Sequence, residues 1–174
     1  MVPAATTLTP VTDSDFAVLR ELAGTIWRQH YSVIIPAAQI DYMLAARFTD
    51  TVLLEHIQAA DTWLEILRVS GKPVGYCAYE LADNYGDGGL AAMKLGQLYV
   101  LASHRGLGLG KFMLGHVEQR ARDLGRYLLW LQVNKRNTGS IAFYKAMGFA
   151  VSREAVFDIG GGFVMDDYVM TKGL

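Results

Sequence analysis

The chain has 174 residues, of which 52% are hydrophobic and 19% are charged, and its formal net charge is −1. This length and composition are typical of one compact domain with a sizeable core, and they exclude a disordered chain. The nearly balanced charge gives no indication of a nucleic-acid partner or an acidic membrane partner. The single cysteine, Cys77, excludes an internal disulfide and a cysteine-based zinc site, and it is expected to be a buried, inert thiol.

Signals for export, membrane insertion and metal binding are also lacking. Residues 1–5 have neither the basic start nor the long apolar core of a signal peptide. No apolar run approaches the roughly 18 residues that a membrane helix needs. The histidines show no metal-ligand spacing. The sequence therefore predicts a cytoplasmic, single-domain protein over residues 1–174, whose apolar and aromatic content would allow a homodimer.

Strand and helix signals alternate through the first hundred residues. Residues 6–11 predict an edge strand, because Pro10 lacks the N–H that an inner strand donates. Asp15 follows Thr12 by three residues, a capping-box variant that predicts a helix start. Apolar periodicity and turn signals then predict helices over residues 16–31, 37–47 and 50–59, an antiparallel hairpin of strands 63–69 and 74–81, a loop over 83–89, and a third strand over 90–101.

The rest of the chain begins with a glycine-rich turn at residues 105–111. It is followed by a predicted helix ended by Gly125, a near-continuous apolar strand over 127–133, a loop, and a short helix over 140–147. Two last strands, over 150–157 and 163–170, flank a glycine loop at 158–162. This order predicts a mixed α+β fold rather than a regular βαβ winding.

The glycine-rich turn is a predicted phosphate site. A strand leads into it and a helix leaves it, so unpaired backbone N–H groups and the positive end of the helix dipole would converge there. Two known phosphate loops do not fit. A P-loop needs Ser or Thr after its lysine, whereas Phe112 follows Lys111, and the glycine spacing differs from that of a dinucleotide fingerprint.

A third pattern, Arg-x-x-Gly-x-Gly after a meander strand, fits in full. In Arg105–Gly110 the chain resembles the acetyl-CoA pyrophosphate loop of the GNAT superfamily of N-acetyltransferases. A second motif lies downstream, where Asn137, Phe143 and Tyr144 precede Gly148-Phe149 at the spacing of that family. Two motifs in the right order make a chance match improbable.

The resemblance implies a GNAT fold, which is a central, mixed, mostly antiparallel, splayed sheet of about six to seven strands flanked by helices. It also implies that acetyl-CoA is the co-substrate. The backbone of Leu98 and Val100 would pair with pantetheine, and the loop amides would bind the pyrophosphate. The residues that it assigns to the cofactor are Leu98, Val100, Arg105, Gly106, Gly108, Gly110, Lys111 and Asn137. Lys111 and the basic loop residues Lys135 and Arg136 would meet the 3′-phosphate.

Tyr144 occupies the family's position for the general acid that protonates the CoA thiolate. The general base is not assigned, because Lys94, Gly96 and Gln97 stand where many members carry a glutamate. A water relay helped by Glu80, Tyr31 or His30 is the alternative.

The acceptor implied by the resemblance is the primary amine of a small molecule or polyamine, acetylated by direct attack on the thioester. The segments that would line its site resemble those of a bacterial branch near the polyamine acetyltransferases. The residues assigned to it are Tyr31, Glu80, Gln97 and Asp167. The neighbouring Asp166 either attracts a cationic amine or is simply solvated. A non-catalytic acyl-CoA-binding module and a protein lysine or N-terminal acetyltransferase remain alternatives.

Overall fold

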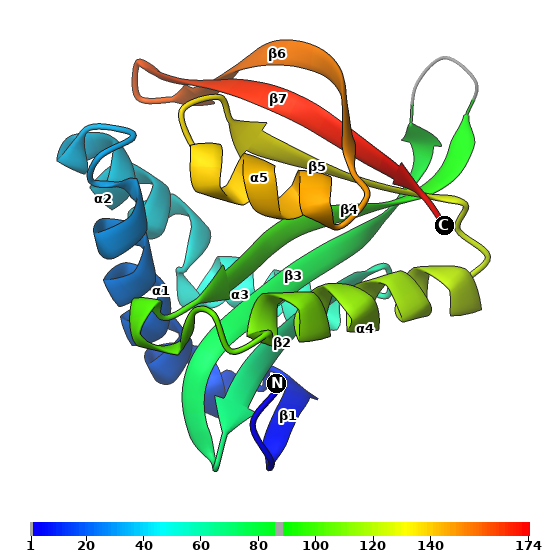
Figure 1. The fold of residues 1–174 in the computed structure, drawn as a ribbon. Coiled ribbons are helices and arrows are strands. Elements are labelled where there is room, and N and C mark those ends of the chain that lie inside the picture. The colour runs from blue at the N-terminus through cyan, green and yellow to red at the C-terminus, as the bar shows by residue number, and fades with distance from the viewer. Residues whose placement is uncertain (1, 86–88) are drawn as a thin grey trace. The chain divides into compact units, whose positions relative to one another are not determined.

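The computed structural model describes residues 2–85 and 89–174 (Figure 1). Its helices are α1 (Phe16–Tyr31), α2 (Ala37–Arg47), α3 (Asp50–Gln58), α4 (Leu109–Asp123) and α5 (Thr138–Ala146), with short 3-10 turns at Asp13–Asp15 and Ala102–His104. Its strands are β1 (Thr6–Pro10), β2 (Thr62–Val69), β3 (Lys72–Tyr85), β4 (Leu90–Val100), β5 (Leu128–Asn134), β6 (Ala150–Gly160) and β7 (Phe163–Gly173).

The strands form one seven-stranded sheet in the order β1-β2-β3-β4-β5-β7-β6. The ladders β1–β2, β2–β3, β5–β7 and β6–β7 are antiparallel, whereas β4 and β5 pair in parallel. This confirms the predicted mixed, mostly antiparallel sheet. The parallel pair follows from the chain path, because α4 intervenes between β4 and β5.

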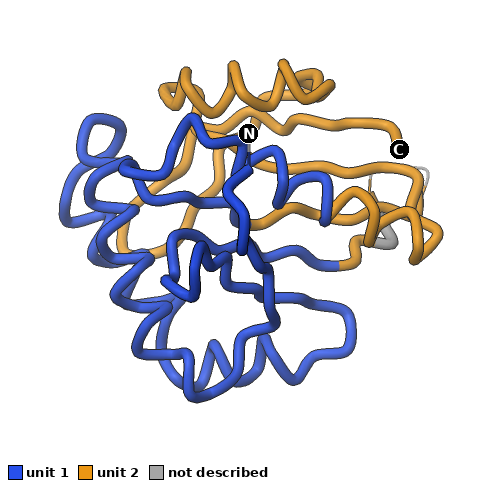
Figure 2. Tube along the Cα trace, turned by 60° about the horizontal axis from the view of Figure 1, so that its bottom comes forward, with its two compact units in different colours: residues 1–80, 97–116 blue, residues 81–96, 117–174 orange. Residues whose placement is uncertain are grey.

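The chain divides into two compact units (Figure 2). Unit 1 comprises residues 1–80 and 97–116, and unit 2 comprises residues 81–96 and 117–174. The first contains the three N-terminal helices, the end of β4 and the glycine-rich turn. The second contains β5, α5 and the last hairpin.

Unit 1 has an aromatic core built on α1. Trp27 and Tyr76 are fully buried, and the Trp27 indole Nε1 donates a hydrogen bond to the Tyr76 hydroxyl over 2.7 Å. Phe48 packs edge-on against both rings. Burial raises the pKa of the Tyr76 hydroxyl well above its ordinary value, so this group stays protonated at neutral pH. This aromatic core is thus apolar in bulk, and its Trp27 and Tyr76 polar atoms are paired with each other.

Unit 2 is centred on β5 and β7. Leu129, Leu131 and Val133 alternate toward one buried face of β5, as period-2 patterning requires. Val169 and Met170 of β7 are fully buried beside them in the β5–β7 ladder. The face of β5 that carries Trp130 is only half-buried, although a near-continuous apolar strand is typical of burial on both faces.

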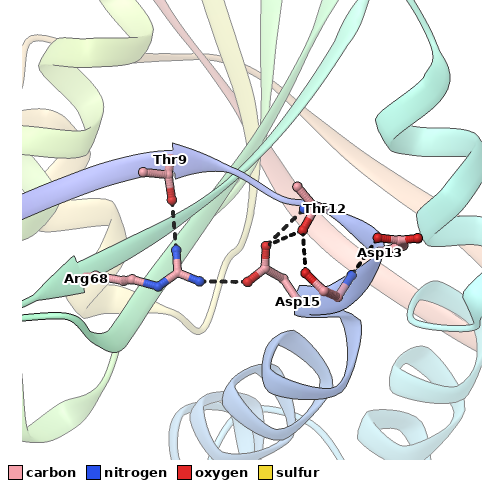
Figure 3. Close-up of polar contacts among 6 residues, drawn as sticks. Thr9, Thr12, Asp13, Asp15 and Arg68 are labelled. Atoms are coloured by element: carbon pink, nitrogen blue, oxygen red, sulfur yellow. Dashed lines mark hydrogen bonds and ion pairs between the residues drawn. The ribbon is translucent and has the colours of Figure 1, made fainter.

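The helix start at Thr12 is confirmed. The Thr12 backbone N–H donates to Asp15 Oδ2 over 3.0 Å, and Arg68 of β2 donates to Asp15 Oδ1 over 2.7 Å and to Thr9 Oγ1 over 2.8 Å (Figure 3). Asp15 therefore ties the first turn before α1 to β1 and β2. Burial alone would raise the pKa of Asp15, but the hydrogen bonds from Thr12 and the Arg68 charge outweigh it, so its pKa lies below 3.8.

This lowered pKa predicts a pH-dependent contribution to stability. A carboxyl whose pKa falls on folding stabilises the fold above its unfolded pKa, and that contribution is lost as the pH drops through the folded pKa. The free energy of unfolding of the wild type should therefore fall below about pH 4 more steeply than that of Asp15→Asn. Denaturant titrations between pH 5 and pH 2.5 measure both slopes, and Arg68→Met should give an intermediate slope. Parallel wild-type and Asp15→Asn curves would contradict this role of Asp15.

Two loop predictions are corrected by longer hairpins. Strand β3 continues to Tyr85, so residues 83–85 of the predicted 83–89 loop are strand, while residues 86–88 lie outside the described residues. Strand β6 continues to Gly160, which pairs with Phe163, so the turn is Gly161-Gly162 alone. Both of these glycines have positive φ, as a two-residue hairpin turn requires. The polar and glycine-rich composition of both segments had suggested loops, but cross-strand pairing prevails.

Two further observations concern only the described part of the chain. It contains no helix long and apolar enough to cross a membrane. Within the same residues, no three His, Cys, Asp or Glu side chains are grouped so that they could hold a metal ion.

Candidate functional site

The C-terminal part of β4 extends beyond its ladder with β5. That ladder runs from Ala92 to Leu95 on β4, and the strand continues for five residues, Gly96–Val100. Gly96 is exposed, and the next four residues are half-buried. This segment contains Leu98 and Val100, whose backbone was predicted to pair with an extended ligand.

A close backbone contact with β3 fixes this end of β4. A Cβ atom at Gly75 would lie only 2.4 Å from the Tyr99 carbonyl oxygen and 3.3 Å from the Val100 Cα. The Leu101 N–H also donates to the Val74 carbonyl over 2.8 Å. Only glycine allows the two strands to approach this closely.

Gly75→Ala should therefore destabilise the protein. We expect a loss of about 1–3 kcal/mol, since overpacked sites cost that much, or roughly 2–4 °C in Tm per kcal/mol for a chain of this size. The control is Gly115→Ala, because Gly115 lies inside α4 with nothing within 4 Å of its would-be Cβ. The Tm of the Gly115→Ala control should match or slightly exceed that of the wild type. A Gly75→Ala protein as stable as the control would show that the contact is relaxed at no cost.

The glycine-rich turn presents a run of backbone donors. Gly106 and Gly108 have φ of 79° and 77°, whereas Gly110 lies in the first turn of α4 and needs no unusual backbone angle. The Phe112 N–H bonds to the Gly108 carbonyl over 3.0 Å. Within the described residues, no backbone acceptor faces the six N–H groups from Gly106 to Lys111. The turn itself is mostly exposed, so these donors at the helix N-terminus are available to an anion.

Side chains from α1 lie beside this turn. His30 Nδ1 is 3.4 Å from an Arg105 guanidinium nitrogen. The Tyr31 hydroxyl lies 2.8 Å from the Tyr99 hydroxyl, which comes from the part of β4 beyond its ladder with β5. Within unit 1, α1 thus places Tyr31 against Tyr99 and His30 beside Arg105. The Tyr99 side chain was not among the residues predicted to take part.

Gln97 and Glu80 lie on the strands of the same unit. The Gln97 side-chain Oε1 is buried and has no hydrogen-bond partner among the described residues. It can accept a hydrogen bond but cannot take a proton as a carboxylate would. Glu80 is half-buried and pairs with Thr62 in the β2–β3 ladder. Lys94, where many relatives of the predicted family carry glutamate, instead lies 5.2 Å from the Trp130 ring centroid in unit 2.

The second motif lies in unit 2. Tyr144 is 9% exposed in α5, and its ring packs against Phe143 and Phe149. Asn137 is buried, and its Oδ1 accepts the Ser140 N–H over 3.3 Å, which caps the start of α5. Asn137 therefore fixes the loop before α5 through this side-chain-to-backbone contact, whereas its contact with a cofactor stays a prediction.

Two of the charged residues predicted for the site, Lys135 and Asp166, are paired with each other. Lys135 Nζ lies 2.6 Å from Asp166 Oδ1 and 2.7 Å from Glu154 Oε2. The hydrogen bonds with Asp166 and Glu154 raise the pKa of Lys135 above its usual range. Asp167, the other member of the predicted acidic pair, is 5% exposed. Lys135 and Asp166 compensate each other, which weakens both as contacts for a phosphate or a cationic amine.

The predicted residues thus fall into two sets. Unit 1 gathers the loop, the end of β4, Tyr31, Glu80 and Gln97, and unit 2 holds Tyr144, Asn137 and Asp167. Sequence reasoning did not identify Gly75 or the Tyr99 side chain. The isolated glycine between Val74 and Tyr76 was the available signal for the first, because glycine inside a strand pattern often marks a close backbone approach.

Known proteins match this chain over most of its length. The profile of the Acetyltransferase (GNAT) family matches residues 20–149. An uncharacterized N-acetyltransferase of Mycobacterium bovis is 26% identical over 167 residues, covering 94% of this chain and 99% of the relative. The L-amino acid N-acyltransferase MnaT of Escherichia coli is 25% identical over 126 residues, covering 65% of this chain and 72% of that protein. Among solved structures, the PaiA N-acetyltransferase of Thermoplasma acidophilum in complex with coenzyme A superposes with a TM-score of 0.81 at 20% identity, covering 97% and 99% of the two chains.

Proposed function

Because the chain belongs to the acetyltransferase (GNAT) family, we propose that it transfers an acetyl group from acetyl-CoA to the primary amine of a small molecule or polyamine. The family match runs through parts of both compact units. It therefore supports the further proposal that residues 1–174 act as one acetyltransferase domain.

The observation that carries this proposal is the set of six N–H groups from Gly106 to Lys111 at the start of α4. Acetyl-CoA is the co-substrate of the family, and its pyrophosphate is the anion that these donors would bind. The exposed Arg105 and Lys111 would add positive charge at the same place. The backbone of Leu98 and Val100, beyond the β4–β5 ladder, would hydrogen-bond the extended pantetheine.

The transfer itself needs an attacking nitrogen and a protonated leaving group. The neutral amine attacks the thioester carbonyl carbon, the C–S bond breaks, and the electron pair leaves on sulfur. A CoA thiol resembles cysteine, with a pKa of about 8.5, so a tyrosine with an ordinary pKa of about 10 is a competent donor to the thiolate. Tyr144 would supply that proton, and the attacking nitrogen loses its own to water.

On the acceptor side, Gln97 is a candidate for orientation rather than for proton removal. Its buried Oε1 would accept an N–H of the amine. Tyr31 and His30 lie next to the loop residue Arg105 and Tyr99 and would guide a water relay, and Glu80 and Asp167 are the remaining carboxylate candidates. The name of the Escherichia coli relative, an L-amino acid N-acyltransferase, supports a small amine acceptor.

The proposal is tested by release of free CoA thiol from acetyl-CoA in the presence of polyamines, amino acids, amino sugars and peptide N-termini. An acceptor-dependent thiol signal, with the acetylated amine identified by mass spectrometry, is the expected result. Omitting the acceptor measures thioester hydrolysis alone.

The alternatives give different outcomes in the same assay. A non-catalytic acyl-CoA-binding module would show a rise in Tm with acetyl-CoA but no thiol release with any acceptor. A protein acetyltransferase would respond to peptides and not to free small amines. If acetyl-CoA causes neither a rise in Tm nor any thiol release, the proposal is overturned altogether.

A further inference from the structure

A buried carboxylate outside the residues assigned to acetyl transfer joins β2, β3 and α4 within unit 1. Glu65 of β2 is only 7% exposed. Its Oε2 accepts a hydrogen bond from the Tyr79 hydroxyl over 3.0 Å and lies 3.0 Å from His116 Nε2, which is also 3.2 Å from Oε1. A carboxylate without such partners would be costly to bury, so these contacts determine where Glu65 can lie.

The surroundings make this arrangement rigid on the strand side. Tyr79 is 2% exposed, and Trp63 stacks on its ring with centroids 5.3 Å apart. Cys77 is fully buried, with its Sγ 3.9 Å from Glu65 Oε2. Burial, followed by the neighbouring Glu65 charge, raises the pKa of the Cys77 thiol well above its ordinary value. Buried neighbours therefore hold Glu65 in place on the strand side, and His116 connects it to α4.

His116 differs from the other contacts that α4 makes in this unit. Leu109, Met113 and Leu114 are almost completely buried and interact through apolar surface. Apolar packing is nondirectional, so by itself it tolerates small rotations and shifts of a helix. A histidine–carboxylate contact is directional and depends steeply on distance, so it selects one rotation and one axial position of α4.

The position of α4 decides where the proposed pyrophosphate donors lie. His116 follows Leu109 by seven residues, which is about 10 Å along a helix at 1.5 Å per residue. The helix is rigid over that length, so its first-turn N–H groups move with the contact at His116. We infer that Glu65 and His116 are positioning residues that set the register of α4 and thereby aim the Gly106–Lys111 amides at acetyl-CoA. This inference rests on the proposed function.

An apolar replacement of the whole cluster separates positioning from stability. Glu65→Leu/Tyr79→Phe/His116→Leu removes the carboxylate, the hydroxyl and the imidazole together and leaves only the weakly donating Cys77 thiol without its acceptor, so Tm should stay within a few degrees of the wild type. The Kd for acetyl-CoA, measured by calorimetry well below Tm, should nevertheless rise about tenfold or more. The kcat at saturating acetyl-CoA should change much less than KM. A control is Lys172→Met, which removes the 2.6 Å ion pair with Glu118 on the same helix in unit 2 and should leave Kd unchanged.

Single variants keep the inference testable if the triple variant does not fold. His116→Gln retains an N–H donor toward Glu65 and should bind acetyl-CoA within about threefold of the wild type, whereas His116→Leu should bind at least about tenfold more weakly. A triple variant with wild-type Kd, or equal Kd values for His116→Gln and His116→Leu, overturns the positioning role alone. A wild-type protein that does not bind acetyl-CoA overturns the proposed function and this inference together.

Discussion

Tyr144→Phe should lower kcat by about 10²–10⁴-fold while leaving the Kd for acetyl-CoA within a small factor of the wild type. Removal of one general acid typically has this effect, because the thiolate must then leave unprotonated or take its proton from water. The substitution removes only the hydroxyl, so the ring contacts with Phe143 and Phe149 are retained. Steady-state kinetics with the best acceptor, together with calorimetric binding of acetyl-CoA, measure the two quantities separately.

The matched control for this prediction is Tyr127→Phe, because Tyr127 is 71% exposed and belongs to the same unit. It should retain wild-type kcat. A series of acceptors adds a second criterion, since the loss of kcat in Tyr144→Phe should shrink with acceptors whose attack, rather than thiolate departure, limits the rate. Wild-type turnover by Tyr144→Phe would remove Tyr144 from the role of proton donor.

Gly108→Leu should abolish detectable binding of acetyl-CoA. Gly108 has a φ of 77°, so a larger residue is strained there, and its side chain would fill the space through which a phosphate reaches the loop amides. We expect Kd to rise at least about 100-fold, equivalent to about 2.7 kcal/mol, and the rise of Tm with acetyl-CoA to disappear. The measurement is thermal unfolding over a range of acetyl-CoA concentrations.

Gly125→Leu is the control for the effect of backbone strain alone. Gly125 follows α4 with a φ of 68° and has nothing within 4 Å of a would-be Cβ, as expected for a helix C-terminus. Both variants should lose stability through the positive φ, by about 1–3 kcal/mol each. Only Gly108→Leu should lose the response to acetyl-CoA. If both variants respond to the ligand as the wild type does, the glycine-rich turn does not hold the pyrophosphate.

The elements of this chain could be predicted from sequence wherever local signals are strong. The first two helices match their predicted bounds because apolar spacing, the Thr12–Asp15 capping pattern and Pro36 all mark the same ends. The strand ends near Tyr85 and Gly160 were predicted less well. Most of their residues are polar or glycine, and only pairing with another strand, which local sequence does not encode, makes them extended.

The candidate site was predictable in its backbone part and much less so in its side chains. The glycines at 106 and 108 indicate a loop conformation directly, because positive φ favours that residue. The contact of Tyr31 with Tyr99 joins residues 68 positions apart in the sequence, and that of His30 with Arg105 spans 75. Such contacts depend on how α1 packs against β4. Periodicity shows that an element has a packed face, but not which side chains meet across it.

The burial of Cys77 also constrains the order of chemical events. Some acyl transfers proceed through a covalent enzyme intermediate on a thiolate nucleophile. Here the only cysteine of the chain is fully buried and its thiol pKa is raised, so it offers no accessible thiolate to accept the acetyl group from the thioester. No cysteine of the chain can therefore hold the acetyl group as a covalent intermediate after CoA leaves. The proposed direct attack would instead require donor and acceptor to occupy the protein at the same time, as a ternary complex.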